Sequence, residues 1–375
     1  MPPAPDQTVG TAAGRVFAFI INNSLLLITG ALVALIWANV AHDSYASLAH
    51  ATHFAVNDIG MVFFFALAMK EVSEAMRPGG PLSSPREAAM PLLAAIGGMA
   101  GPAAFYLAAI GIIGQPELHA GWAIPCATDI AFSYLVARII FPAGHPAIPF
   151  LLLLAIADDA LGLIVLAIFY PSGEVSLLLL AGFLVPAIGL AWVMRRFGVA
   201  SFWAYLLGPG ALSWVGLFYG GLHPALALVP VIPLMPIETM RAFEHWWKVP
   251  VQFILLGFGL VNAGVPLAAV GPISWVVAAS LVVGKPAGIV ATTFVGELIG
   301  FRRAAGLDYR SIVTLGIAAG IGFTVALFFA TAAFPPGLVL DEAKMGALFS
   351  FFASVVAIGV GRALRVGRAP MHAAD

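Results

Sequence analysis

The stretch FLLLLAIADDALGLIVLAIFY, residues 150–170, is apolar except for two adjacent carboxylates, Asp158 and Asp159, near its middle. A helix of about 20 apolar residues spans the hydrocarbon core of a bilayer. An ionised carboxylate at the centre of such a helix costs about 2.5–3.5 kcal/mol on insertion scales. Charges placed there at this cost usually serve a function, so the pair predicts both a membrane location and a functional site.

The rest of the chain has the composition of a membrane protein. Of its 375 residues, 61% are hydrophobic and 9% are charged, whereas soluble domains carry about 25% charged residues. Apolar runs of about 20 residues recur throughout, which predicts an all-α polytopic membrane protein. The single cysteine, Cys126, excludes an internal disulfide. No nucleotide, catalytic-triad, haem or Cys-rich metal motif occurs, so we expect neither an enzyme nor an ATP-driven pump, no cofactor and no nucleic-acid partner.

Hydrophobic segments divide the chain into twelve expected transmembrane helices. They run over residues 15–40, 56–77, 87–113, 121–139, 147–170, 175–196, 201–219, 222–236, 244–264, 271–297, 309–332 and 341–364. Residues 1–14 form a polar tail ahead of a single transmembrane domain, 15–375. Most of the 17 Lys and Arg residues fall on one side of this topology, and the positive-inside rule then places both termini, and the tail, in the cytoplasm.

Two of the expected helices are interrupted at similar places. Residues 121–139 contain Pro125, which lacks a backbone donor, shortly before Thr128 and Asp129. Residues 309–332 contain the glycine-rich centre GIAAGIGFT. Small residues at this spacing also occur where helices merely pack closely. Taken together, breaks at matching places in two halves point to a substrate site near the midplane of the membrane.

The two interrupted helices would be the middle helices of two three-helix units, approximately residues 87–170 and 271–364. These units would form an inverted repeat. Broken helices leave backbone dipole ends facing each other inside the membrane, and these ends need compensating charges. Asp129 at the first break and Lys285 inside the tenth span suit that role.

Asp158 and Asp159 are expected to have different roles, because adjacent residues on a helix point about 100° apart. Lys285 is the natural partner for one of them, since a buried ammonium and a buried carboxylate offset each other's desolvation. A purely structural salt-bridge cluster would leave the second aspartate unmatched. Carboxylates near Thr128 and Asp129 suit a small hard cation, which takes oxygen ligands. The same carboxylates bind protons, so cation and protons would compete for one site, which predicts exchange.

Further polar residues are candidates for a role in pH response. Glu71 and Glu74 lie near the expected cytoplasmic end of the second span, either as interface residues that extend toward water or as groups that attract cations and sense pH. His223, near a span start, is either a structural histidine or a pH switch. Asp58 is a further acidic residue inside the second span. Residues 41–55 are expected to form an external loop.

Several segments, in order along nearly the whole chain, resemble the NhaA family of bacterial sodium/proton antiporters. They are WAIPCATDIAF (122–132), LAIADDALG (154–162), NAGV (262–265), GKPAGI (284–289) and GIAAGIGFT (316–324), supported by VNDIGMVFF (56–64) and AAIGGM (94–99).

The resemblance implies a twelve-helix fold with inverted repeats and two interrupted, crossing helices, the fourth and the eleventh. It implies electrogenic exchange of cytoplasmic Na⁺ or Li⁺ for external H⁺ in the bacterial inner (plasma) membrane, by a protein that is embedded in the lipid bilayer and can form a homodimer. Asp159 is implied as cation ligand and proton carrier, with Asp158 beside it paired to Lys285. Asp129, with Thr128, is implied at the helix crossing.

By the same resemblance, Glu71 matches an acidic position associated with pH response, and His223 matches a histidine linked to pH sensing. Asp58 matches an acidic residue of the second span. The chain departs from the family in three places. The basic pair that commonly follows the glutamate is absent here, residues 41–55 are shorter than the family's dimer-contact hairpin, and DDALG replaces DDLGA.

Three other classes of function remain open from the residues themselves. Cotransport of an organic anion, such as a bile acid, on a related fold would favour helix N-termini and polar side chains over a pair of acids. A scaffold or sensor without transport would tolerate neutralisation of Asp158 and Asp159. A channel is less consistent with the sequence, which contains no sign of a repeated pore ring.

Overall fold

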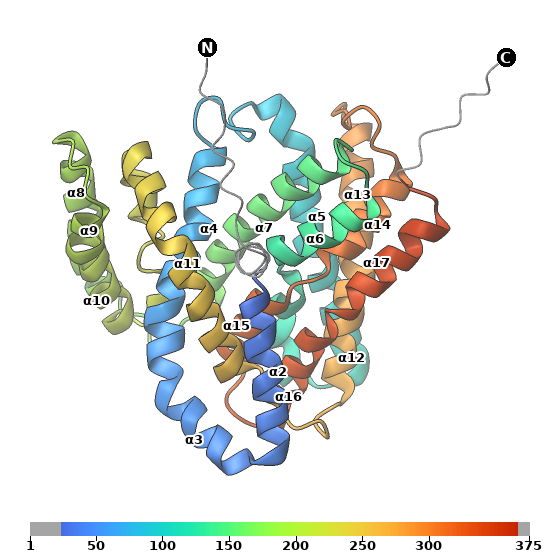
Figure 1. Ribbon diagram of the computed structural model, residues 1–375, viewed down its shortest axis with the longest axis horizontal. Coiled ribbons are helices and arrows are strands. Elements are labelled where there is room, and N and C mark those ends of the chain that lie inside the picture. Colours follow the sequence, from blue (N-terminus) through green and yellow to red (C-terminus); the bar gives the residue numbers. More distant parts are fainter. Residues whose placement is uncertain (1–23, 367–375) are drawn as a thin grey trace, which may run out of the picture.

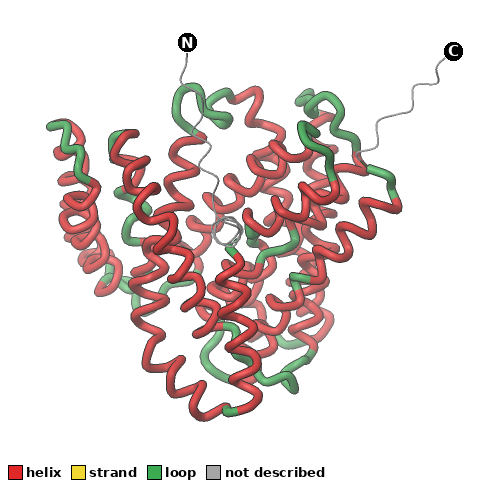
Figure 2. Tube along the Cα trace, in the orientation of Figure 1, coloured by secondary structure: helices red, strands yellow, loops and turns green. Residues whose placement is uncertain are grey.

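The computed structural model describes residues 24–366, and this part of the chain is a bundle of helices without strands (Figures 1 and 2). The expected polar tail and the first part of the expected span 15–40 lie outside the described residues. Six helices are long and apolar enough to cross a membrane, or up to eight if each of two bent helix pairs counts as one span. The prediction of a polytopic helical membrane protein is therefore confirmed at this level.

The elements are described in chain order. The first half contains α2 (Leu25–Val40), α3 (His42–His53), η1 (Phe54–Gly60), α4 (Met61–Ala75), α5 (Pro85–Ile113), η2 (Pro116–Cys126), α6 (Ile130–Ile140), α7 (Ala147–Phe169), α8 (Leu177–Arg196), α9 (Phe202–Tyr205), η3 (Leu206–Gly210) and α10 (Ala211–Tyr219). The second half contains η4 (Pro224–Leu226), η5 (Ile232–Leu234), α11 (Ile237–Asn262), α12 (Pro272–Ala279), η6 (Ser280–Gly284), α13 (Lys285–Leu298), α14 (Tyr309–Ala319), α15 (Phe323–Ala333), α16 (Leu338–Phe349) and α17 (Phe352–Ala363).

The structure differs from the expected spans in two segments. Residues 222–236 contain only the short 3₁₀ turns η4 and η5, because four prolines in GLHPALALVPVIPLMP remove backbone donors and prevent a continuous helix. Residues 41–55, expected as a loop, instead contain α3, which continues through η1 into α4 as one apolar stretch, His42–Ala75. The acidic first turn and the histidines of the last turn of α3 suit the dipole of a helix.

Helices α5 and α13 approach each other so closely that only glycine fits between their backbones. A Cβ atom on Gly97 would lie 2.3 Å from the Gly288 carbonyl oxygen, and one on Gly101 would lie 2.4 Å from the Gly284 carbonyl oxygen. Small residues spaced by four are the usual means of close packing between membrane helices. Lys285 follows Gly284 directly, so this contact also fixes where the lysine enters the bundle.

Replacing Gly288 by Leu is expected to destabilise the bundle by about 1–3 kcal/mol or more, because the new side chain would collide with backbone that cannot move aside. The matched control is Gly189→Leu on α8, where an added Cβ would meet nothing within 4 Å. The measurement is the thermal unfolding temperature of the purified protein in detergent. Equal unfolding temperatures for the two variants would show that the α5–α13 contact does not limit stability.

Candidate ion-binding site

Two helix pairs are bent at short breaks inside the bundle. Elements η2 and α6 are bent by 57°, and α14 and α15 are bent by 53°. The two breaks contact each other. The Asp129 backbone N–H donates to the Ile321 carbonyl at 2.6 Å, and the Ser133 hydroxyl donates to the Ala318 carbonyl at 2.9 Å. Polar groups of the first break thus form hydrogen bonds with carbonyl groups of the second break. Such partners are needed because unpaired backbone groups are costly inside a membrane.

The local sequence explains why the chain breaks at these points. Pro125, near the end of η2, has no N–H with which to continue a helical ladder. In the second break, a Cβ on Gly322 would lie 2.4 Å from the Ala127 carbonyl oxygen, and one on Gly320 would lie 2.5 Å from the Leu281 carbonyl oxygen. Glycine is therefore required where the second break rests against the first and against η6.

Asp129 and Thr324 join the two breaks through their side chains. The Thr324 hydroxyl donates to Asp129 Oδ2. Asp129 precedes the first residue of α6, and Thr324 lies in the first turn of α15. A carboxylate is favourable near helix N-termini, where unpaired N–H groups carry partial positive charge. Thr324 was not among the predicted site residues, although its place directly after the glycine-rich centre was a usable signal.

Helix α7 carries the aspartate pair past the breaks. Asp158 is buried, and its Oδ2 accepts from Lys285 Nζ at 2.6 Å and from the Thr128 hydroxyl at 2.7 Å. Lys285 is fully buried and also donates to the Cys126 carbonyl at 2.5 Å. Within residues 24–366, Asp158 Oδ1 has no hydrogen-bond partner. One oxygen of Asp158 therefore holds the lysine, and the other remains available to a ligand.

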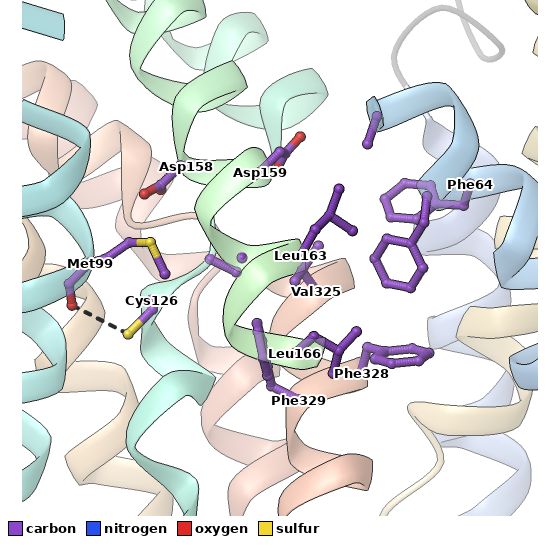
Figure 3. A pocket seen from close by; sticks show the side chains of 14 residues that line it. Phe64, Met99, Cys126, Asp158, Asp159, Leu163, Leu166, Val325, Phe328 and Phe329 are labelled. Carbon is purple, nitrogen blue, oxygen red and sulfur yellow. Dashed lines mark hydrogen bonds between the residues drawn. The ribbon is translucent and has the colours of Figure 1, made fainter. Parts of the chain in front are cut away.

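Asp158 and Asp159 point in different directions from α7 (Figure 3). Asp158 points toward the side of Met99 and Cys126, whereas Asp159 points toward the side of Phe64 (Figure 3). None of the ion pairs found among the described residues involves Asp159. The adjacent carboxylates thus have distinct surroundings, one paired with Lys285 and the other without a cationic partner in the described chain.

Asp159 lines a cavity of about 300 Å³ on one side of the breaks. The cavity is also lined by two further carboxylate residues, Glu71 and Asp129, and by hydroxyl residues that include Thr128 and Thr324. Glu71 is exposed at the protein surface. Oxygen atoms of this kind are the ligands that small hard cations prefer.

The other side of Asp159 is closed by apolar side chains (Figure 3). A second cavity next to both aspartates measures only about 20 Å³, close to the room needed by one water molecule. We call its apolar wall the apolar barrier, which consists of Leu163, Leu166, Val325, Phe328 and Phe329. Phe328 also packs edge-on against Phe65, with ring centroids 5.1 Å apart. The site is therefore accessible from the side of Glu71 and closed on the side of the barrier.

Glu74 belongs to a charged cluster between α4 and α11. Lys70 Nζ lies 2.7 Å from Glu74 Oε2 and also pairs with the Glu244 carboxylate, while Arg241 Nε lies 3.5 Å from Glu74 Oε1. Lys70 is only 5% exposed, so it does not extend to the interface in the way that the sequence alone allowed. Glu244 was not predicted, because its contact with Lys70 joins segments far apart in the chain. The cluster adjoins Glu71 in sequence.

The structure does not bring Asp58 or His223 into the cavity. Asp58 lies in η1, where its backbone carbonyl accepts from Trp214 Nε1 at 2.9 Å. The His223 ring packs against Phe328, with centroids 5.1 Å apart, and its Nδ1 has no hydrogen-bond partner among the described residues. His223 therefore contacts the apolar barrier, and neither His223 nor Asp58 is among the described residues that line the cavity.

The model of a family described as Na⁺/H⁺ antiporter 1 matches residues 16–363. The chain belongs to this family. The resemblance stated from the motifs is thereby confirmed, and the family is one of antiporters rather than of enzymes.

The chain is similar to the Na⁺/H⁺ antiporter NhaA of Geobacter sulfurreducens, with 45% identity over 92% of this chain and 97% of that protein. It is also similar to the Na⁺/H⁺ antiporter NhaA of Desulfitobacterium hafniense, with 43% identity over 92% of this chain and 94% of that protein. A solved structure with the same fold is the sodium proton antiporter MjNhaP1 from Methanocaldococcus jannaschii. Its TM-score is 0.57 at 15% sequence identity, covering 91% of this chain and 92% of that one.

Removing one partner of the Lys285–Asp158 pair is expected to destabilise the protein by about 3–5 kcal/mol, because the other charge is left buried without compensation. Lys285→Met and Asp158→Asn should each lower the unfolding temperature in detergent. The double variant should recover much of the loss, since neither charge then remains. Strictly additive losses in the double variant would show that the two groups do not stabilise each other.

Proposed function

We propose that this chain is a secondary active antiporter that exchanges cytoplasmic Na⁺ or Li⁺ for external H⁺. The observation that carries the proposal is the situation of Asp159, a carboxylate that forms no ion pair within residues 24–366 and lines a cavity open on one side and closed by the apolar barrier on the other. The names of relatives that are 45% and 43% identical support Na⁺ and H⁺ as the exchanged ions.

Cation binding would use the oxygen atoms around Asp159. The Asp159 carboxylate is the primary ligand. Additional candidates are the Thr128 hydroxyl and Oδ1 of Asp158, which has no hydrogen-bond partner among the described residues. Asp129 adds negative charge along the same cavity. Hard cations such as Na⁺ and Li⁺ favour such ligands, and water in the cavity can complete the shell.

Exchange follows from the cost of moving an uncompensated charge. An ionised Asp159 facing the apolar barrier would be poorly solvated, so the site is expected to change its accessibility only when the carboxylate holds a cation or a proton. The joined breaks are suited to this change, because they meet through a few hydrogen bonds rather than through continuous helices. Alternating loading by Na⁺ and H⁺ then produces antiport with little leak of either ion.

Lys285 gives a physical basis for electrogenic exchange. A cation that engages Asp158 Oδ1 competes electrostatically with the ammonium on Oδ2, so binding weakens the hold on Lys285. If each cation displaces two protons from the group formed by Asp159, Asp158 and Lys285, every cycle moves net charge across the membrane. Asp129 is proposed to keep the helix termini compensated throughout.

The proposal includes the finer topology expected from the sequence. It comprises twelve spans, of which residues 222–236 would cross as short 3₁₀ turns rather than as a continuous helix, with an inverted repeat at approximately residues 87–170 and 271–364. Both termini would lie in the cytoplasm of a bacterial cell, with the protein in the inner membrane and able to form a homodimer. Support comes from the two bent pairs, 57° and 53°, each of which lies between unbroken helices in its half of the chain.

We also propose that Glu71 and Glu74 take part in the response to pH. Glu71 lines the cavity leading to Asp159, and Glu74 is part of the charged cluster that ties α4 to α11. His223 is proposed to act through its contact with Phe328 of the apolar barrier. Asp58, which is not among the described residues that line the cavity, is included only as a further acidic residue of this region.

Proteoliposomes with an imposed pH gradient and a pH dye inside test the exchange directly. Wild-type protein is expected to give dequenching on addition of Na⁺ or Li⁺ but not choline, and Asp159→Asn should abolish the response. Asp43→Asn, at an exposed residue of α3, is the matched control and should respond like the wild type. Silence of the wild type at every pH would refute antiport, and a response to K⁺ alone would refute the proposed ions.

Competition between cation and protons predicts a particular dependence of KM on pH. Because a cation must displace protons from the carboxylates, the apparent KM for Na⁺ should rise on the acidic side by about tenfold per pH unit for each proton displaced. The maximal rate at saturating Na⁺ should change much less. An apparent KM that stays constant while the rate falls with acidification would argue for pH control at a separate site.

A further inference from the structure

Three arginines gather where the C-terminal ends of α6 and α17 meet. Arg138 is in the last turn of α6, Arg362 is in the last turn of α17, and Arg365 follows that helix. All three are exposed and line one cavity of about 440 Å³, which we call the arginine pocket. None of the ion pairs among residues 24–366 involves them, and the proposed ion exchange does not use them.

The helix ends that carry these arginines are held at a fixed separation. A Cβ on Gly361 would lie 2.7 Å from Ile140 Cγ2 and 3.1 Å from Thr314 Cγ2, so α17 packs directly against α6 and α14. The Arg138 guanidinium lies over the Tyr134 ring, 5.7 Å from its centroid, which favours an orderly side chain. The three positive charges are therefore kept close together despite their mutual repulsion.

The backbone conformation at Arg365 is unusual for an arginine. Its φ is +54°, in the left-handed region where glycine is favoured at a helix C-terminus. The Val366 N–H donates to the Gly361 carbonyl at 3.1 Å, which completes the usual helix-terminating pattern. A long cationic side chain thus occupies a position that glycine would fill without strain.

The remainder of the pocket is apolar. Ile139, Ile140, Phe141, Pro142 and Ile358 line it beside the arginines, and Ile139 is 59% exposed. Helix α17 is part of the apolar segment Leu338–Ala363, and α6 is part of the bent helix pair that begins with η2. Each of these is long and apolar enough to cross a membrane. The pocket therefore has positive charge next to an exposed apolar surface, at the end of helices of this kind. This combination suits a lipid, which has a charged headgroup and hydrocarbon chains.

We propose that the arginine pocket binds an anionic phospholipid, with its phosphate on Arg138, Arg362 and Arg365 and an acyl chain against Ile139 and Ile358. Guanidinium groups bind phosphate oxygens in bidentate fashion, and basic pockets between membrane helices accept anionic headgroups. Three arginines suit a headgroup with two phosphates, so a diphosphatidyl lipid such as cardiolipin should bind more tightly than phosphatidylglycerol. A lipid bound there joins α6, which begins next to Asp129, to α17.

The test uses full-length protein in a neutral detergent and follows its unfolding temperature while cardiolipin, phosphatidylglycerol, phosphatidylcholine or inorganic phosphate is added. Cardiolipin is expected to raise the unfolding temperature of the wild type at the lowest concentration. Arg138→Gln and Arg365→Gly should each raise the half-maximal cardiolipin concentration roughly tenfold, for loss of one charge-assisted contact. Arg302→Gln, at an exposed arginine outside the pocket, is the matched control and should behave like the wild type.

Arg365→Gly is the decisive variant, because glycine suits the left-handed backbone and the fold should be at least as stable as before. An unchanged cardiolipin response in Arg138→Gln and Arg365→Gly would overturn the proposal. So would equal stabilisation by phosphatidylcholine, which carries no net charge. Full stabilisation by inorganic phosphate alone would identify a site for a free anion and would likewise overturn the assignment to a lipid.

Discussion

A lysine and an aspartate inside an apolar bundle each carry a desolvation cost of several kcal/mol, which falls only when the two charges meet in good geometry. Lys285 and Asp158 meet at 2.6 Å, and much of the surrounding structure serves this contact. The glycines of α5 and α13 set the depth of the lysine, while Thr128 and the Cys126 carbonyl satisfy further hydrogen bonds of the pair. The first break in the helices is thereby tied to α7.

This pairing also determines the state of the neighbouring residue. Because Lys285 is committed to Asp158, no lysine or arginine of the described chain neutralises Asp159, which lines the open cavity instead. Two identical side chains adjacent in sequence thus acquire different chemistry from helix geometry alone. The difference needs no change of residue type, only a partner placed on one side of α7.

Local patterns in the sequence predicted much of this arrangement. The apolar stretch around Asp158 and Asp159 predicted α7, and the proline and glycines of the interrupted segments predicted where the helices bend. Both features depend on residues near one another in the chain. Contacts between distant segments were predicted less completely. The pairing of Lys285 with one of the aspartates was expected because both charges are buried, whereas the pairing of Lys70 with Glu244 and of Asp129 with Thr324 emerged only from the fold.

One error in the predicted elements has a local cause instead. Residues 222–236 are apolar enough for a span, but their prolines outweigh hydrophobicity in deciding backbone conformation. The apolar barrier has a consequence of a different kind, for the electric field across the membrane. Where water enters the cavity as far as Asp159, little voltage falls along it, and the drop is concentrated over the thin layer of Phe328 and its neighbours. A charge crossing this layer alone would experience most of the available energy, about 2.3 kcal/mol per 100 mV.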